Sequence, residues 1–186
     1  MAVDQSLLKD VLTDLKLYKD FIIKNDIPAA IKGNCNYLAA LGLSTYTEVF
    51  GGLYQGDLRQ GRGKKNYDAF IKDFFHKDYI DVDRRLEDDG LRGLYGAVRS
   101  GLVHEYLIKD TSIVVMYRKS QMSCAILYDP MATPKIMFVV EQYFDDFKNA
   151  FNGYYSRIQK EPNLVDRFVA GLNSISSPLP RGNKIL

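Results

Sequence analysis

The sequence contains few cysteines and no long apolar segment, and these absences exclude several classes of protein. The two cysteines, Cys35 and Cys124, do not form a CxxC pair, which argues against a disulfide scaffold or a zinc site. We therefore expect both to be buried free thiols. The longest purely apolar stretches, such as Ile136 to Val140, are far shorter than the roughly 20 residues that a membrane helix requires. The sequence therefore predicts no membrane span.

Neither sign of charge dominates, because 25 basic and 23 acidic side chains give a formal net charge of +2. Any attraction to nucleic acid must therefore come from local clusters of basic residues. The first ten residues include an early acid and lack the basic region and long apolar core of a secretory signal, so we expect a cytoplasmic protein. With 46% hydrophobic and 26% charged residues, the composition is that of a folded globular protein.

Apolar residues recur at intervals of three and four along most of the chain, which is the spacing of amphipathic helices. The stretches with this spacing are 7–23, 67–75, 91–102 and 141–158. Asp26 and Pro28 are typical of a helix start, and we expect that helix to continue to Leu43. Thr45 and Glu48 have capping-box spacing for a further short helix.

Between residues 112 and 140 the pattern changes to short runs rich in β-branched and aromatic residues, which predicts two or three strands. Glu161 and Pro162 predict the start of a last helix that ends before Ser176. We expect residues 176–186 to form a flexible tail. The sequence therefore predicts a mainly α protein: a helical bundle in one domain, 1–175, with a small β insert after the fourth major helix.

Residues 51–66 combine five glycines with several basic residues and have no sustained apolar spacing. Gly51 and Gly52 are expected to stop the preceding helix, so this segment is predicted to be an exposed basic loop. Its cations could contact RNA phosphates, although a simple solvated loop is the alternative. The candidate RNA-binding residues are Arg59, Arg62, Lys64, Lys65 and, further along the chain, Arg92.

The segment from Leu94 to Leu107 contains a more specific pattern, in which Arg99, His104 and Tyr106 form R-x4-H-x-Y. This pattern resembles the R-x4-6-H signature of the HEPN superfamily, helical bundles that include many metal-independent endoribonucleases. The longer form is similar to that of the HEPN toxins that are paired with nucleotidyltransferase antitoxins. In those toxins the tyrosine can receive nucleotide groups from the antitoxin, and Tyr106 is the matching position here.

The resemblance implies a homodimer in which two motif helices meet at a cleft, with Arg99 and His104 as catalytic residues and no metal or other cofactor. The residue types suit this chemistry, because histidine transfers protons near neutral pH and arginine binds phosphate oxygens. Arg99 and His104 stand about 140° apart on an ideal helix, which favours a site completed by a second subunit. Ser100, Glu105 and Tyr106 are expected to support the site.

Two other functions stay open at this point. The same helices could serve a noncatalytic module that binds a partner or dimerises, or the chain could be the toxin of a toxin–antitoxin pair. We expect His76 to be packed or solvated, and the acidic residues between Asp78 and Asp89 to be helix-start and surface charges. Neither group predicts a metal site.

Overall fold

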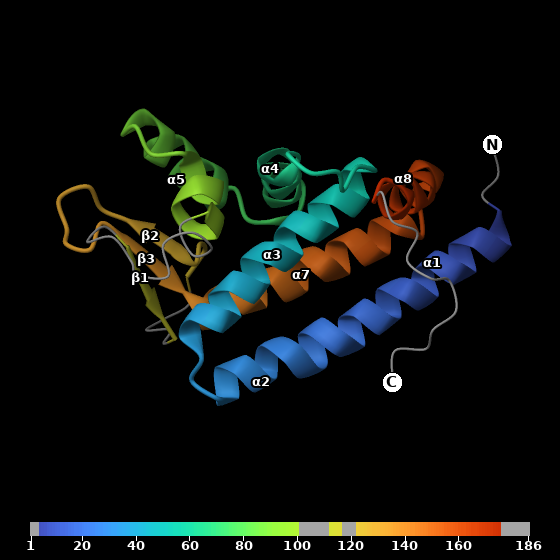
Figure 1. Ribbon diagram of the computed structural model, residues 1–186, viewed down its shortest axis with the longest axis horizontal. Helices are drawn as coiled ribbons and strands as arrows, with labels where there is room; N and C mark the ends of the chain where they lie inside the picture. Colours follow the sequence, from blue (N-terminus) through green and yellow to red (C-terminus); the bar gives the residue numbers. More distant parts are fainter. Residues whose placement is uncertain (1–3, 101–111, 117–121, 176–186) are drawn as a thin grey trace.

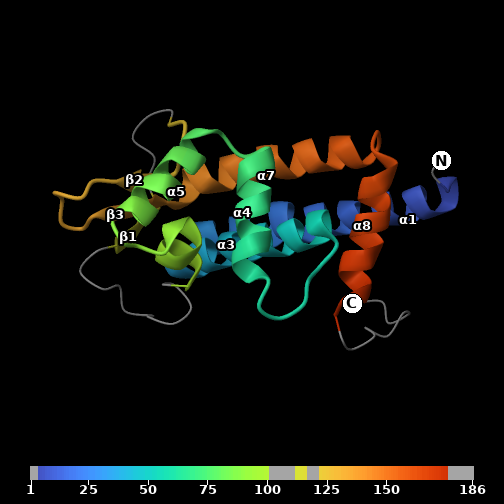
Figure 2. The same cartoon turned by 90° about the horizontal axis from the view of Figure 1, so that it is seen from above.

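Helices dominate the fold, which a computed structural model describes for residues 4–100, 112–116 and 122–175 (Figure 1). In chain order, the elements are α1 (Gln5–Tyr18), the π-helical η1 (Lys19–Asp26), α2 (Ile27–Lys32), α3 (Asn36–Gln55), α4 (Gly63–Phe74), α5 (Asp78–Asp88), the π-helical η2 (Tyr95–Ser100), β1 (Ser112–Val115), β2 (Ile126–Tyr128), β3 (Ile136–Val139), α7 (Val140–Ile158) and α8 (Pro162–Asn173). The long N-terminal helix, α3 and α7 extend along the molecule, and α4 and α8 cross over them (Figure 2). The predicted mainly α fold with a small strand insert is confirmed.

The N-terminal helix is longer than its apolar spacing indicates. The side chain of Asp4 caps α1 by accepting hydrogen bonds from the backbone N–H groups of Ser6 and Leu7, at 2.9 and 3.4 Å. The helix then continues through η1 directly into α2. Pro28 lies in the first turn of α2, as predicted, but no break separates that turn from η1.

The second predicted helix, which starts at Asp26, ends earlier than predicted. We expected helical structure up to Leu43, but α2 stops before Gly33 and the chain turns there. Asn34 adopts a φ of 56°, a left-handed conformation that asparagine tolerates better than most residues. The backbone N–H of Cys35 donates to the carbonyl oxygen of Ala30 at 2.9 Å, which satisfies one of the last carbonyls of the helix. The prediction of a continuous helix is therefore wrong at this turn.

Gly51 and Gly52 lie inside α3 and do not stop it, so the predicted short helix ending at these glycines is wrong. The helix continues to Gln55 and is closed by Gly56, whose φ of 77° is typical of a C-terminal cap. A Cβ atom added at Gly51 would lie only 1.9 Å from the carbonyl oxygen of Asn66 in α4. Gly51 therefore allows the backbones of α3 and α4 to approach each other closely.

The described strands form one small sheet at the end of the bundle, with the order β1-β3-β2. β3 is central, because it pairs in parallel with β1 and antiparallel with β2. Phe138 of β3 is aligned with Val114 on one side and Ile126 on the other. All three side chains are buried, so the sheet contributes its inner face to the same hydrophobic core as the helices.

Aromatic side chains from α3, α4 and α7 form the centre of this core. The rings of Phe50 and Phe151 meet edge to face, with their centroids 5.1 Å apart. The buried hydroxyl of Tyr143 shares hydrogen bonds with the hydroxyls of Thr47, at 3.0 Å, and Tyr67, at 2.9 Å. Because these residues come from α7, α3 and α4 respectively, the two bonds join three helices at one point.

The two cysteines differ in exposure, so the prediction that both are buried is wrong for Cys35 and confirmed for Cys124. Burial raises the pKa of the Cys124 thiol to about 12, so its reactive thiolate form is scarce at neutral pH. We expect iodoacetamide at about pH 8 to label only Cys35 in the native protein, and both cysteines after denaturation in urea. Peptide mass spectrometry measures this, and equal labelling of both thiols in the native protein would contradict the described burial of Cys124.

Candidate functional site

Arg99, the first residue of the R-x4-H-x-Y pattern, lies in η2 against α3. Its Nε donates a hydrogen bond to Oε2 of Glu48 at 2.8 Å. The two side chains are 21% and 23% exposed, so the pair is held at the edge of the core rather than free in solvent. This contact uses one of the five N–H donors of the guanidinium group, and Glu48 fixes where that group lies.

Tyr95 and Gly63 complete the surroundings of the Glu48 and Arg99 pair. A Cβ atom added at Gly63, the first residue of α4, would lie 2.3 Å from Oη of Tyr95 and 2.7 Å from Oε1 of Glu48. Both polar atoms therefore lie directly against the glycine backbone. The pKa of Tyr95 is raised, first by burial and then by the neighbouring Glu48 carboxylate, while Arg99 opposes the shift. Tyr95 therefore stays protonated beside the carboxylate at neutral pH.

The start of the motif helix is attached to α5. Oδ1 of Asp83 accepts a hydrogen bond from the backbone N–H of Leu94 at 2.7 Å. Gly93 precedes this residue with a φ of 63°, and a Cβ atom at that position would lie 2.5 Å from the same carboxylate oxygen. The glycine and the aspartate together therefore determine where the helix that carries Arg99 begins.

The remaining residues of the motif are only partly within the described structure. Ser100 is the last residue of η2. The second predicted catalytic residue, His104, and its predicted neighbours Glu105 and Tyr106 fall in 101–111, outside the described residues. The structure therefore gives the position of Arg99, and the role of His104 stays a prediction from the sequence.

The predicted basic loop is shorter than expected, because only residues 56–62 connect α3 to α4. Within it, Arg59 forms a two-point contact with the Asp57 carboxylate at 2.8 and 2.7 Å, and Arg62 lies 3.2 Å from the same carboxylate. Hydrogen bonds from Arg59 hold the pKa of Asp57 below its usual range, so the carboxylate remains charged. Two arginines therefore share one negative charge, which reduces the positive potential of this loop.

The other candidate RNA-binding residues lie in and after α4. Lys64 contacts Asp68 at 2.7 Å and Glu87 at 3.3 Å, so its charge is compensated by carboxylates from α4 and α5. Lys65 and Arg92 are exposed. Lys64 is exposed as well, and RNA binding by these three residues stays a prediction.

Two features are absent from the described part of the chain. No group of three or more histidine, cysteine, aspartate or glutamate side chains is arranged there to hold a metal ion. Among the helices in the same ranges, none combines the length and apolar content that crossing a bilayer requires.

Glu48 and Tyr95 are site residues that the sequence analysis missed. The sequence places Glu48 in a capping box with Thr45, but in the structure it lies within α3 and contacts Arg99, 51 residues away. Tyr95 falls within the apolar spacing of 91–102, which predicts core packing, but its hydroxyl lies close to Glu48. No local pattern identifies either contact.

Comparison of the chain with protein-family models, curated proteins and solved structures finds no match.

Proposed function

We propose that this chain is a HEPN-like cytoplasmic protein that binds RNA and cleaves it without a metal ion, as a homodimer. The observation that carries the proposal is that Arg99, the first residue of the R-x4-H-x-Y pattern, lies in a helix packed into the bundle and is held at the edge of the core by Glu48. An arginine held in this way can receive a phosphate with little loss of side-chain entropy.

The proposed chemistry is attack of an RNA 2′-hydroxyl on the adjacent phosphate. His104 takes the proton from the 2′-hydroxyl and returns a proton to the departing 5′-oxygen, and Arg99 stabilises the additional negative charge that develops on the phosphate. The products are a 2′,3′-cyclic phosphate end and a free 5′-hydroxyl. Each step requires only protein side chains, so a chelator is not expected to inhibit it.

Incubation of the purified protein with single-stranded RNA in excess EDTA tests this function. We expect cleavage, with cyclic phosphate ends identified by mass spectrometry. RNA binding without cleavage would contradict the enzymatic proposal and favour a noncatalytic binding module. One observation favours that second candidate: Arg99 is paired with a carboxylate of the same chain, so a phosphate would have to share the arginine with Glu48.

The Glu48 and Arg99 contact is also expected to stabilise the fold. Glu48→Ala removes a partly buried hydrogen bond between charged groups, and we expect it to lower the free energy of unfolding by about 1 to 2 kcal/mol. Urea denaturation of Glu48→Ala, Arg99→Ala and the double variant measures the coupling between the two residues. Arg59→Ala, which breaks an ion pair of an exposed arginine, is the matched control and should change stability less than Glu48→Ala does. Additive effects of Glu48→Ala and Arg99→Ala would show that the two side chains do not interact in solution.

A further inference from the structure

A cavity of about 570 Å³ lies between the end of α4, the segment before β2 and one face of α7. Phe74, Phe75 and Met122 supply apolar walls, and Gln142 and Asp146 of α7 supply polar groups. This volume is within the range of small-molecule sites, and the lining combines an apolar side with a larger number of polar and charged side chains. Arg99, Glu48 and Tyr95 are not among the lining residues, so the cavity is separate from the proposed ribonuclease site.

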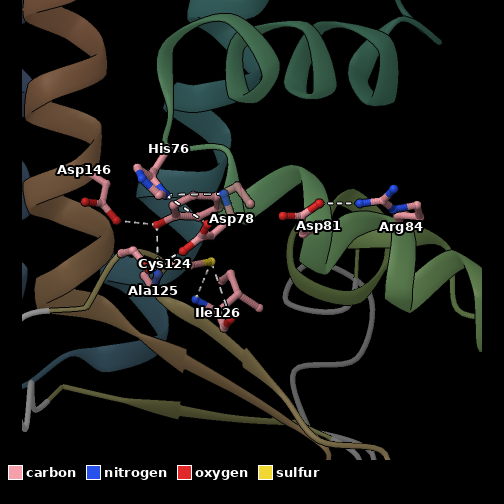
Figure 3. Close-up of polar contacts among 10 residues, drawn as sticks. His76, Asp78, Asp81, Arg84, Cys124, Ala125, Ile126 and Asp146 are labelled. Carbon is pink, nitrogen blue, oxygen red and sulfur yellow. Dashed lines mark hydrogen bonds and ion pairs between the residues drawn. The ribbon is translucent and has the colours of Figure 1, made fainter.

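The polar side of the cavity is fixed by hydrogen bonds. Asp146 Oδ2 accepts a bond from the hydroxyl of Tyr79 at 2.6 Å, and its Oδ1 accepts one from the amide of Gln142 at 2.9 Å. Tyr79 is fully buried, and its hydroxyl oxygen also accepts a hydrogen bond from the backbone N–H of Ala125 at 3.1 Å. Figure 3 shows Asp146 extending from α7 toward the segment that contains His76 and Asp78. The carboxylate is therefore held in one orientation before any ligand arrives.

The apolar side is also fixed. The ring of Phe75 packs against the rings of Tyr79 and Tyr143, with centroid separations of 5.0 and 5.4 Å. Tyr79 and Tyr143 are both fully buried, so Phe75 has little freedom to move into the cavity. A ligand would therefore enter a site that is already formed, which lowers the entropy cost of binding.

The charges around the cavity favour a cation. Nζ of Lys148 lies 2.6 Å from Oδ1 of Asp145, so the charges of these two side chains compensate each other. The hydrogen-bond donors to Asp146, by contrast, are the neutral groups of Tyr79 and Gln142. Burial raises the pKa of Asp146, and the neighbouring Asp145 adds to this effect, while the hydrogen bonds and His76 oppose it. A cation placed next to Asp146 would supply the opposite charge that its hydrogen-bond donors lack.

We propose that this cavity binds a small organic cation, an ammonium group on an apolar or aromatic stem. The ammonium group donates to the carboxylate of Asp146. The stem packs on Phe74, Phe75 and Met122. This site does not depend on the proposed ribonuclease activity, and its test uses no RNA.

Isothermal titration calorimetry with 2-phenylethylamine tests the proposal, with 2-phenylethanol and 3-phenylpropanoate as neutral and anionic probes of similar shape. We expect the amine to bind at least about tenfold more tightly than the alcohol. Its charged ammonium group forms a stronger hydrogen bond with the Asp146 carboxylate than the neutral hydroxyl group does. Equal affinity for the amine and the alcohol, or no binding of the amine, would overturn the proposal.

Two variants locate the site. Asp146→Asn keeps the size of the side chain and removes its charge, so the preference for the amine over the alcohol should disappear. Asn149→Trp adds a large side chain to the lining and should weaken binding of both probes. Asp10→Asn, an equal change of charge on the exposed face of α1, is the control and should bind the amine as the unmodified protein does. Unchanged amine binding in folded Asp146→Asn would exclude this carboxylate as the binding group.

Discussion

His104→Ala is expected to lower the rate of RNA cleavage by about 10²- to 10⁴-fold while the protein stays folded. This is the typical contribution of a general acid or base, and His104 is the side chain that we assign to proton transfer. The measurement is the single-turnover cleavage rate in excess EDTA. Circular dichroism and the melting temperature should match those of the unmodified protein.

The chain provides a matched control, because it has only one other histidine. His76 lies near Asp78, with the Nδ1 and Oδ1 atoms 3.3 Å apart, and its side chain is 51% exposed. His76→Ala should leave the cleavage rate unchanged. If His104→Ala and the unmodified protein cleave at the same rate, the observed nuclease is either a contaminant or uses another residue, and the enzymatic proposal is wrong.

The helices and the strand insert could be predicted because their signals are local. An amphipathic helix repeats its apolar residues every three or four positions, and a window of the sequence contains the whole signal. The stripe containing Phe147, Phe151 and Tyr154 predicted α7, and these side chains are buried in the structure. The β-branched run at 136–140 predicted β3 in the same way.

The contacts that position Arg99 could not be predicted, because they join distant parts of the chain. Glu48 reaches Arg99 only because α3 packs against η2, and Asp83 reaches the backbone of Leu94 only because α5 lies beside the start of the motif helix. The sequence pattern identified a candidate arginine by its spacing from His104. It contained no information about the carboxylate that holds the arginine in place.

Glycine positions were misinterpreted for a related reason. A glycine pair in a sequence is typical of a helix end, and this pattern predicts the end of a helix at Gly51 and Gly52. In α3 these glycines serve tertiary packing, because the α4 backbone at Asn66 occupies the space that a Cβ atom of Gly51 would fill. A glycine pair that ends a helix and a glycine pair that packs against another helix have the same local pattern, so only the position of the second helix distinguishes them.

Gly51→Ala is therefore expected to destabilise the protein strongly. Helix propensity alone predicts the opposite, because alanine is about 1 kcal/mol better than glycine inside a helix. The added Cβ, however, would lie 1.9 Å from the carbonyl oxygen and 2.5 Å from the carbonyl carbon of Asn66, and backbone atoms cannot rotate away as a side chain can. We expect a net loss of about 3 kcal/mol or more, because α3 and α4 must separate.

Thermal and urea denaturation measure this effect, and the expected fall in melting temperature is roughly 6 to 12 °C. Gly153→Ala is the matched control. Gly153 also lies within a helix, but its added Cβ would meet the Phe74 ring at an ordinary contact distance of 3.5 Å. That variant should therefore be as stable as the unmodified protein, or more stable by about 1 kcal/mol. If Gly51→Ala behaves in the same way, α3 and α4 do not approach each other as closely as described, and the position of Gly63 beside Tyr95 and Glu48 would also be wrong.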